Sequence, residues 1–285
     1  MGKILFVLSL LFFNINAQAV ERIIFPAMTE EQATRFDDLF EILGIALQKT
    51  VTEFGDYVLI PTSVSMTESR LLQEVETGRL IDIIWSSTSP QKEQALRPIR
   101  IPLRKGILGY RISFIHKHNQ FSFDTIKNLD ELRQFRIGQG IGWGDVALYK
   151  HSGIIVEQAP YQSLFKMIGP RRFDLFPRGI SEIFTELAVY GKDNPSLKIE
   201  DNLMLYYPWP YYFFTSKNNE KLANRIEIGL EMMIKDGTFE SIFMKYNQDA
   251  IHKARLNERH LIPLENPFLP DKTPLDRKEL WFVPN

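Results

Sequence analysis

The chain has 285 residues, with 34 Lys and Arg against 35 Asp and Glu, and no cysteine. The missing cysteine excludes disulfides, thiolate metal sites, a thiol nucleophile and a lipid attached at cysteine. The near-zero net charge, without a long run of one sign, excludes the electrostatic footprint of a nucleic-acid-binding protein. The length suffices for two domains of moderate size.

Residues 1–19 have the pattern of a secretory signal peptide. Lys3 precedes an apolar stretch from Ile4 to Phe13, and the small residues Ala17 and Ala19 follow it. This apolar stretch is too short to cross a bilayer of roughly 30 Å. We therefore predict a soluble mature protein that begins near Val20. Because no cysteine can carry a lipid anchor, we expect it in a Gram-negative periplasm.

The first part of the mature chain alternates strands and helices. A strand over Glu21 to Phe25 precedes a helix whose apolar residues recur at three- and four-residue spacing. A strand over Tyr57 to Pro61, a helix between the capping box Ser65 to Glu68 and Gly78, and a strand over Leu80 to Trp85 follow. This order favours an α/β layer with a mostly parallel sheet. The apolar face of the first helix consists of Phe36, Leu39, Phe40, Leu43, Leu47, Val51 and Phe54.

Two extended stretches, Ile99 to Ile115 and Leu203 to Thr215, interrupt this alternation. Between them the periodicity predicts a second α/β series. Its helices are Leu129 to Arg133, Asp145 to Gly153, Ser163 to Ile168 and Ile180 to Tyr190, and its strands are Phe135 to Gly138, Ile154 to Gln158 and Phe173 to Phe176.

After the second stretch, two helices are predicted on either side of Gly237, the second capped by Thr238 and running through Tyr246. The tail from Leu261 to Asn285 carries five prolines. We predict an ordered wrap rather than a disordered end, because its large apolar residues need burial. These residues are Phe268, Leu275, Trp281 and Phe282.

These patterns predict an α/β protein of two lobes joined by two extended hinge crossings, as in a hinged clamshell. Lobe 1 is discontinuous and comprises residues 20–104 and 212–285, and lobe 2 comprises residues 105–211. We expect the crossings at the back of a cleft, with hinge segments near Arg100 to Tyr110 and Tyr207 to Tyr212, and we expect a monomer.

Several stretches resemble the family 3 extracytoplasmic solute-binding proteins, the amino-acid-type periplasmic receptors of ABC importers. In chain order they are LLQEVETGRLIDIIWSSTS, TIKNLDELRQFRIGQGIGWGD, RRFDLFPRGISEI and NEKLANRIEIGLEMMIKDGTFESIFMKY. The last is the most specific, because a helix that ends in a D-G-T turn and is followed by an I-x-x-K-Y helix closes the first lobe in that family. The resemblance covers nearly the whole mature chain and implies a bilobed type II periplasmic-binding-protein fold.

The chain departs from the family at both usual anchors for an amino acid. The turn that supplies the family's carboxylate-binding arginine reads Ser89-Pro-Gln-Lys-Glu93 here, so Lys92 is the substitute to test if amino acids bind. Where the second lobe of the family offers an aspartate to the ligand's ammonium, this chain has Pro177 and Arg178. The resemblance, with these departures, therefore implies poor binding of standard α-amino acids.

Arg178 is a candidate anion-binding residue. It follows a buried apolar run and precedes a predicted helix, so its guanidinium and the free N–H groups of the helix start could bind an anion. Alternatively, Arg178 pairs with Glu182, one turn further on, or with an acid in the other lobe. The sequence leaves both readings open.

Other candidate ligand contacts come from strand ends and loops. Trp85 could stack on a ligand or belong to the core, and the hydroxyls and N–H groups that follow it could bind without charge. Asp145 is expected to cap its helix more than to contact a ligand, with Trp143 at the rim. Arg100 and Tyr110 lie on the first crossing. We expect them to stabilise the hinge, although either side chain could enter the cleft. The polar residues after Trp85 are Ser86, Ser87 and Thr88.

The function predicted from these patterns is that of a periplasmic protein that closes on a small polar, anionic solute and delivers it to the membrane permease of an ABC importer. The alternative is a sensor subunit that presents its ligand-bound form to a membrane signalling protein. A hydrolytic enzyme on the same fold is the third hypothesis, since no nucleophile-elbow or metalloprotease motif occurs but a dyad could assemble in space. The histidines lack metal-binding spacing, and no metal or cofactor is expected.

Overall fold

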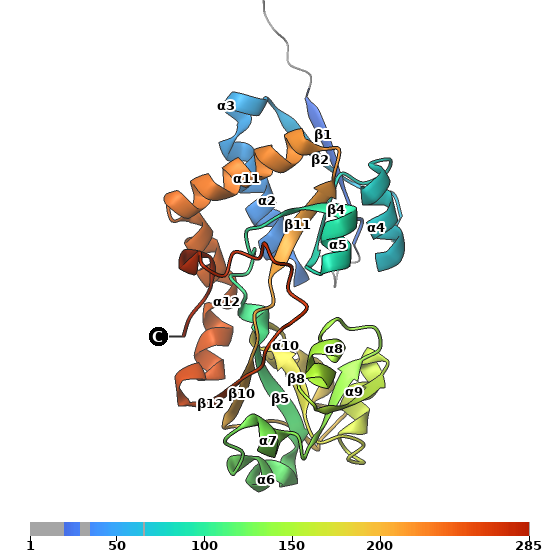
Figure 1. The fold of residues 1–285 in the computed structure, drawn as a ribbon, viewed down its shortest axis with the longest axis vertical. Coiled ribbons are helices and arrows are strands. Elements are labelled where there is room, and N and C mark those ends of the chain that lie inside the picture. Colours follow the sequence, from blue (N-terminus) through green and yellow to red (C-terminus); the bar gives the residue numbers. More distant parts are fainter. Residues whose placement is uncertain (1–19, 29–34, 65, 285) are drawn as a thin grey trace, which may run out of the picture.

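The computed structural model describes residues 20–28, 35–64 and 66–284, so the predicted signal peptide and Ser65 lie outside it. The chain forms two α/β lobes, one above the other in Figure 1, with helix α12 and the C-terminal tail running beside both. None of the helices in the described ranges is long and apolar enough to cross a membrane.

The upper lobe in Figure 1, lobe 1, contains two small sheets. Strands β1 (Glu21–Phe25) and β2 (Tyr57–Pro61) pair in parallel, and β3 (Ile83–Ser87) and β4 (Leu96–Ile99) lie antiparallel on either side of β11 (Tyr211–Ser216). The predicted alternation of strands and helices is confirmed, but among the described residues of lobe 1 parallel pairing is limited to β1 and β2. The helices are α2 (Asp37–Lys49), α3 (Val51–Phe54), α4 (Glu68–Thr77), α5 (Pro90–Ala95) and α11 (Glu220–Lys235).

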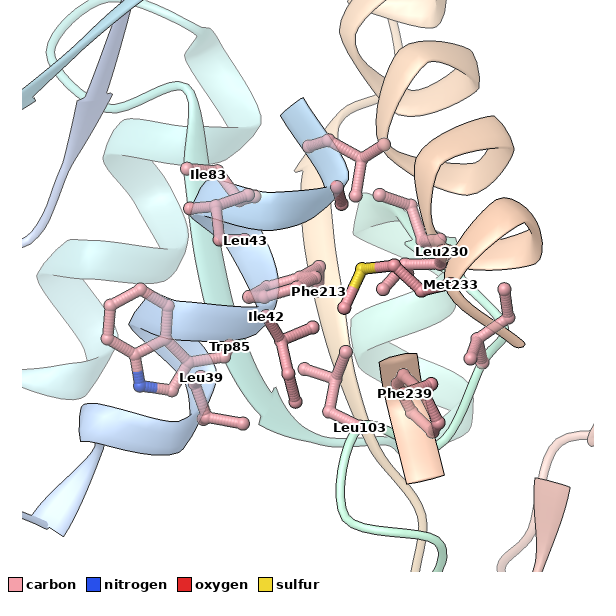
Figure 2. Close-up of a cluster of buried hydrophobic side chains, with 14 of the residues drawn as sticks. Leu39, Ile42, Leu43, Ile83, Trp85, Leu103, Phe213, Leu230, Met233 and Phe239 are labelled. Carbon is pink, nitrogen blue, oxygen red and sulfur yellow. The ribbon is translucent and has the colours of Figure 1, made fainter. Parts of the chain in front are cut away.

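The core of lobe 1 lies between α2, α11 and the β3-β11-β4 sheet. Figure 2 shows Leu39, Ile42 and Leu43 of α2 facing Leu230 and Met233 of α11, with Phe213 of β11 between them. These side chains follow the helical spacing of the sequence, and burying each contributes roughly 1.5–3 kcal/mol. Trp85, at the edge of this cluster, therefore has its ring packed in the core.

Lobe 2 is built on a four-strand path in the order β12-β10-β5-β8, and β9 (Leu197–Ile199) pairs with the far end of β5. The path consists of β12 (His260–Pro263), β10 (Leu203–Tyr206), β5 (Tyr110–His116) and β8 (Phe176–Gly179). A separate parallel pair, β6 (Arg136–Gly140) and β7 (Ile155–Ala159), lies beside it. The helices are α6 (Gln120–Asp124), α7 (Leu129–Leu132), α8 (Asp145–His151), α9 (Tyr161–Met167) and α10 (Ile180–Tyr190), and the short 3-10 turns are Ile107–Gly109 and Lys117–Asn119.

Two segments connect the lobes at the places that the sequence predicts, but the first contains turns and the 3-10 helix Ile107–Gly109 and is not extended throughout. The first runs from β4 to β5, and the second runs from β10 to β11. They touch each other at Gly109, whose backbone oxygen accepts a hydrogen bond from the N–H of Tyr207 at 3.3 Å. Further along, the N–H of Leu103 donates to the oxygen of Tyr211 at 2.9 Å. The two crossings therefore form one paired unit at the junction of the lobes.

Helix α12 (Thr238–Ala254) and the tail also bridge the lobes. Phe239 and Ile242 of α12 pack in the lobe 1 core, whereas Phe243 and Ala254 pack in lobe 2. After the 3-10 turn Leu256–Glu258, strand β12 pairs in parallel with β10 of lobe 2, although the sequence analysis placed all of 212–285 in lobe 1.

The rest of the tail returns toward lobe 1 (Figure 1), through the 3-10 turn Lys278–Leu280. The ring of Trp281 closes against Gly106, where a Cβ would meet it at 2.5 Å. Trp281 is buried as predicted, but Phe268 and Leu275 are 43% and 52% exposed. The C-terminal tail is thus packed against the protein through Trp281, whereas Phe268 and Leu275 contribute less burial.

Helix α4 is capped by Thr67, which accepts from the N–H of Arg70 at 3.4 Å, and Ser65, where the predicted capping box begins, lies outside the described residues. The strand predicted over Phe173 to Phe176 instead begins at Phe176 and continues through Pro177 and Arg178, because the chain here pairs with β5. Pro177 is tolerated because β8 ends the sheet path and needs a partner on one side only.

Candidate functional site

A cavity of about 950 Å³ lies where the two lobes meet. Its walls come from the ends of β3 and α5 in lobe 1, from β5, β8, α8 and α10 in lobe 2, and from the second crossing. Most of the predicted ligand contacts line it, and Arg100 and Tyr110 do not. The predicted residues in its wall are Trp85, Ser86, Ser87, Thr88, Trp143, Asp145 and Arg178.

The polar residues of lobe 1 are held by one another. The ammonium of Lys92 donates to Ser86 Oγ at 2.6 Å and to the backbone oxygen of Ser87 at 3.1 Å, while Thr88 Oγ1 donates to Glu93 at 2.7 Å. Helix α5 sets Lys92 in place, because Ser89 caps it by accepting from the Lys92 N–H at 3.2 Å. This places a cation in the lobe 1 wall, in the turn that lacks the family's arginine.

Arg178 is 3% exposed, and its donors are largely occupied. Nε lies 2.8 Å from Glu186 Oε2 and Nη2 lies 2.6 Å from Glu186 Oε1, and Nη2 also approaches Glu182 at 3.2 Å. Its guanidinium stacks over the ring of Trp143, 4.5 Å from the ring centroid. The pairing with Glu182 that the sequence left open is therefore present, and Glu186 is the stronger partner. The anion contact proposed for Arg178 stays a prediction.

Glu182 is the meeting point of several guanidinium groups. Arg35 of lobe 1 reaches it at 2.5 Å, and Arg178 and Arg111 of lobe 2 lie at 3.2 and 3.7 Å. Burial alone would raise the pKa of Glu182, but the positive charges of Arg178, Arg35 and Arg111 outweigh burial and lower the pKa to about 2. Glu182 therefore carries an ion pair from one lobe to the other.

Asp145 does not cap helix α8. The N-cap is Gly144, and the carboxylate of Asp145 instead accepts from the hydroxyl of Tyr207 at 3.0 Å and lies 3.4 Å from Arg111. Tyr207 in turn lies 3.0 Å from the hydroxyl of Tyr149. The sequence analysis could not anticipate this, because Tyr207 is 62 residues away along the chain.

Arg111 is the cavity residue that the sequence analysis missed. It lies on β5, 5% exposed, between Asp145 and Glu182, and its guanidinium is 5.5 Å from the ring centroid of Tyr207. A charged residue inside the apolar strand YRISFIH was the available signal. Other wall residues that were not singled out are Tyr161, Trp209, Asn266 and Phe268, the last two from the tail.

Arg100 and Tyr110 have structural partners away from the cavity, as expected for the first crossing. Arg100 binds Glu93 with Nη2 at 2.5 Å. The hydroxyl of Tyr110 donates to the backbone oxygen of Phe282, and its ring packs on Tyr206. Across the described ranges, no group of three His, Asp or Glu side chains could hold a metal ion.

The comparisons with known proteins give structural similarity only. No protein-family model matches the chain, and no curated protein matches it. Among solved structures, an ancestral arginine-binding protein bound to arginine is 20% identical, covering 73% of this chain and 86% of that chain with a TM-score of 0.49. An amino acid ABC transporter substrate-binding protein from Streptococcus pneumoniae, bound to L-arginine, is 16% identical, covering 74% and 82% with a TM-score of 0.49.

A third solved structure is that of an ancestral amino acid-binding protein described as a precursor of cyclohexadienyl dehydratase. It is 18% identical, covering 73% of this chain and 84% of that chain with a TM-score of 0.48. All three of these proteins are described as binding amino acids.

Proposed function

We propose that the chain is an extracytoplasmic solute-binding protein, which closes its lobes on a small polar, anionic solute and delivers it to the permease of an ABC importer. The observation that carries this is the cavity of about 950 Å³ lined from both lobes and from the crossings that join them. Cavities between domains, walled by apolar surface with a few charged groups, are characteristic of small-molecule sites. The predicted lobes, 20–104 with 212–285 and 105–211, remain part of this proposal, except that β12 (His260–Pro263) joins the sheet of lobe 2.

The cations of the cavity wall favour an anion. Arg111 and Arg178 of lobe 2 are 5% and 3% exposed, and Lys92 adds a cation from lobe 1. Guanidinium groups in a cavity wall pair well with a negative charge on a solute.

One contact resembles a catalytic dyad, namely Lys92 Nζ at 2.6 Å from Ser86 Oγ. Lys92 also donates to the backbone oxygen of Ser87, which fixes its side chain in the cavity wall. We infer a binding role for the pair. A serine-reactive fluorophosphonate should leave Ser86 unlabelled, and labelling that disappears in Ser86→Ala would favour the hydrolytic alternative.

The direct test is to purify the secreted chain under gentle conditions and record a native mass spectrum. A bound small molecule, released on unfolding, is the expected result. Small-angle scattering before and after the released compound is added back should show a more compact particle, because the ligand draws the lobes together. A chain that carries no compound and is not stabilised by any solute of a periplasmic extract would contradict the proposal.

A further inference from the structure

Arg111 is a buried cation whose hydrogen bonds are missing. Within the described residues its guanidinium has two ion-pair contacts, Nη2 to Asp145 Oδ2 at 3.4 Å and Nη1 to Glu182 Oε2 at 3.7 Å. Both are longer than a well-formed N–H···O bond, and the buried Nε has no partner. A buried charged group whose donors lack acceptors lowers the stability of the folded protein.

The other buried arginines of the chain are not in this state. Arg104 binds Asp38 at 2.6 and 2.7 Å and the backbone oxygen of Arg35 at 2.8 Å. Arg225 has acceptors at 2.6 and 2.7 Å from Glu21 and Gly55. Arg178 holds Glu186 with two of its nitrogens. Arg111 differs from these three in its contacts and is also placed in the wall of the cavity.

We propose that Arg111 is the principal charged contact of the ligand and that the ligand is a monocarboxylate with a flat apolar body. This rests on the proposed function, since it assigns the chemistry of the same cavity. A planar guanidinium with free donors matches a carboxylate in a bidentate pair. The two oxygens of the ligand's carboxylate would then accept hydrogen bonds from the guanidinium of Arg111, which lacks acceptors in the protein. Arg178, with its donors engaged by Glu186, positions Trp143 and Glu182 around this contact.

The surroundings of Arg111 select among anions. Asp145 and Glu182 lie against the same guanidinium, so their negative charges repel a second charge on the ligand. This disfavours phosphate, sulfate and dicarboxylates relative to a monocarboxylate. The remaining wall is rich in aromatic rings, which pack well on a flat apolar body. These rings belong to Phe36, Trp85, Trp143, Tyr161, Trp209, Tyr211 and Phe268.

The test uses matched acid and amide probes. Acetate, benzoate, phenylacetate and 3-phenylpropionate, each beside its amide, are added to the full chain, and melting temperature and calorimetric affinity are measured. At least one aromatic acid should stabilise the protein while its amide does not. Arg111→Met should weaken that binding roughly 10- to 100-fold, and Arg111→Lys should restore little of it. Arg136→Met, at an exposed arginine of lobe 2 outside the cavity, is the matched control and should bind as the parent does.

Three results would overturn the assignment: equal binding of acid and amide, unchanged affinity in Arg111→Met, or no stabilisation by any of the four acids. If Arg111→Met does not fold, Arg111→Lys, which keeps the charge beside Asp145 and Glu182, decides the question. The native mass spectrum of the unmodified chain separates this failure from that of the proposed function. A co-purified compound that is not a carboxylate would leave solute binding standing and remove Arg111 as its anchor.

Discussion

Gly109 and Tyr207 hold the two crossings in backbone contact. A Cβ on Gly109 would lie 2.0 Å from the backbone oxygen of Tyr207, so only glycine allows this approach. Gly109→Ala should force the crossings apart and lower the free energy of unfolding by about 1–3 kcal/mol. The measurement is urea denaturation of the variant and the parent.

Gly44 supplies the control for this substitution. It lies inside α2, and an added Cβ would meet nothing within 4 Å. Gly44→Ala should therefore raise the free energy of unfolding by about 0.5–1 kcal/mol, because alanine loses less conformational entropy in a helix. A Gly109→Ala variant as stable as Gly44→Ala would show that the contact between the crossings is unimportant.

Arg178 and Glu186 are predicted to depend on each other for stability. Arg178→Ala leaves the carboxylate of Glu186, which is 7% exposed, without its main counter-charge, and should cost about 3–5 kcal/mol of unfolding free energy. Arg178→Met combined with Glu186→Leu should recover most of that loss. A double-mutant cycle of Arg178→Met and Glu186→Leu, each alone and both together, measures this by denaturant unfolding, and additive losses would refute the pairing.

The free energy of unfolding should depend on pH in part because Glu182 titrates. Its pKa is lowered from 4.5 to about 2 in the folded chain, so its contribution is full at pH values above its unfolded pKa and is lost as the pH falls through the folded pKa. Glu182→Gln should destabilise the protein at pH 6. The difference from the parent should shrink between about pH 4.5 and pH 2. Unfolding curves at pH 6, 4 and 3 test this, and a pH-independent difference would contradict it.

The C-terminal tail should be anchored by Trp281. Its ring lies against Gly106, and its indole N–H donates to the backbone oxygen of Pro274 at 2.8 Å. Trp281→Ala should lower the free energy of unfolding by about 3–5 kcal/mol. Phe268→Ala, at a 43% exposed position of the same tail, should change it by less than about 0.5 kcal/mol. Comparable losses in the two variants would mean that the tail is held along its whole length.

The order of strands and helices and the existence of two crossings could be predicted from the sequence, because apolar periodicity reports which face of each element is buried. The role of Asp145 could not. Its position after Gly144 fits a helix cap, but a tyrosine from the second crossing competes for its carboxylate. Likewise, the strand around Pro177 depends on pairing with β5, which local sequence does not encode.

The candidate site, like the fold, could be predicted only in part from the sequence. Residues after Trp85 could be located in the cavity wall because strand ends and the loops after them form clefts in α/β folds. Arg111 could not be recognised, since its significance is the absence of hydrogen-bond partners in three dimensions. The spacing of residues along the chain does not show that a donor lacks an acceptor in the folded protein.

The salt bridge between Glu21 and Arg225 has a consequence for the order in which the chain gains structure. These residues close a contact across 204 positions, at 2.6 Å, so lobe 1 cannot be completed until α11 has been synthesised. By contrast, β6, α8, β7 and α9 meet near neighbours in sequence and can fold early. The apolar face of α2 therefore lacks its α11 partner until late in synthesis, and the sheet of lobe 2 gains strand β12 only after α11.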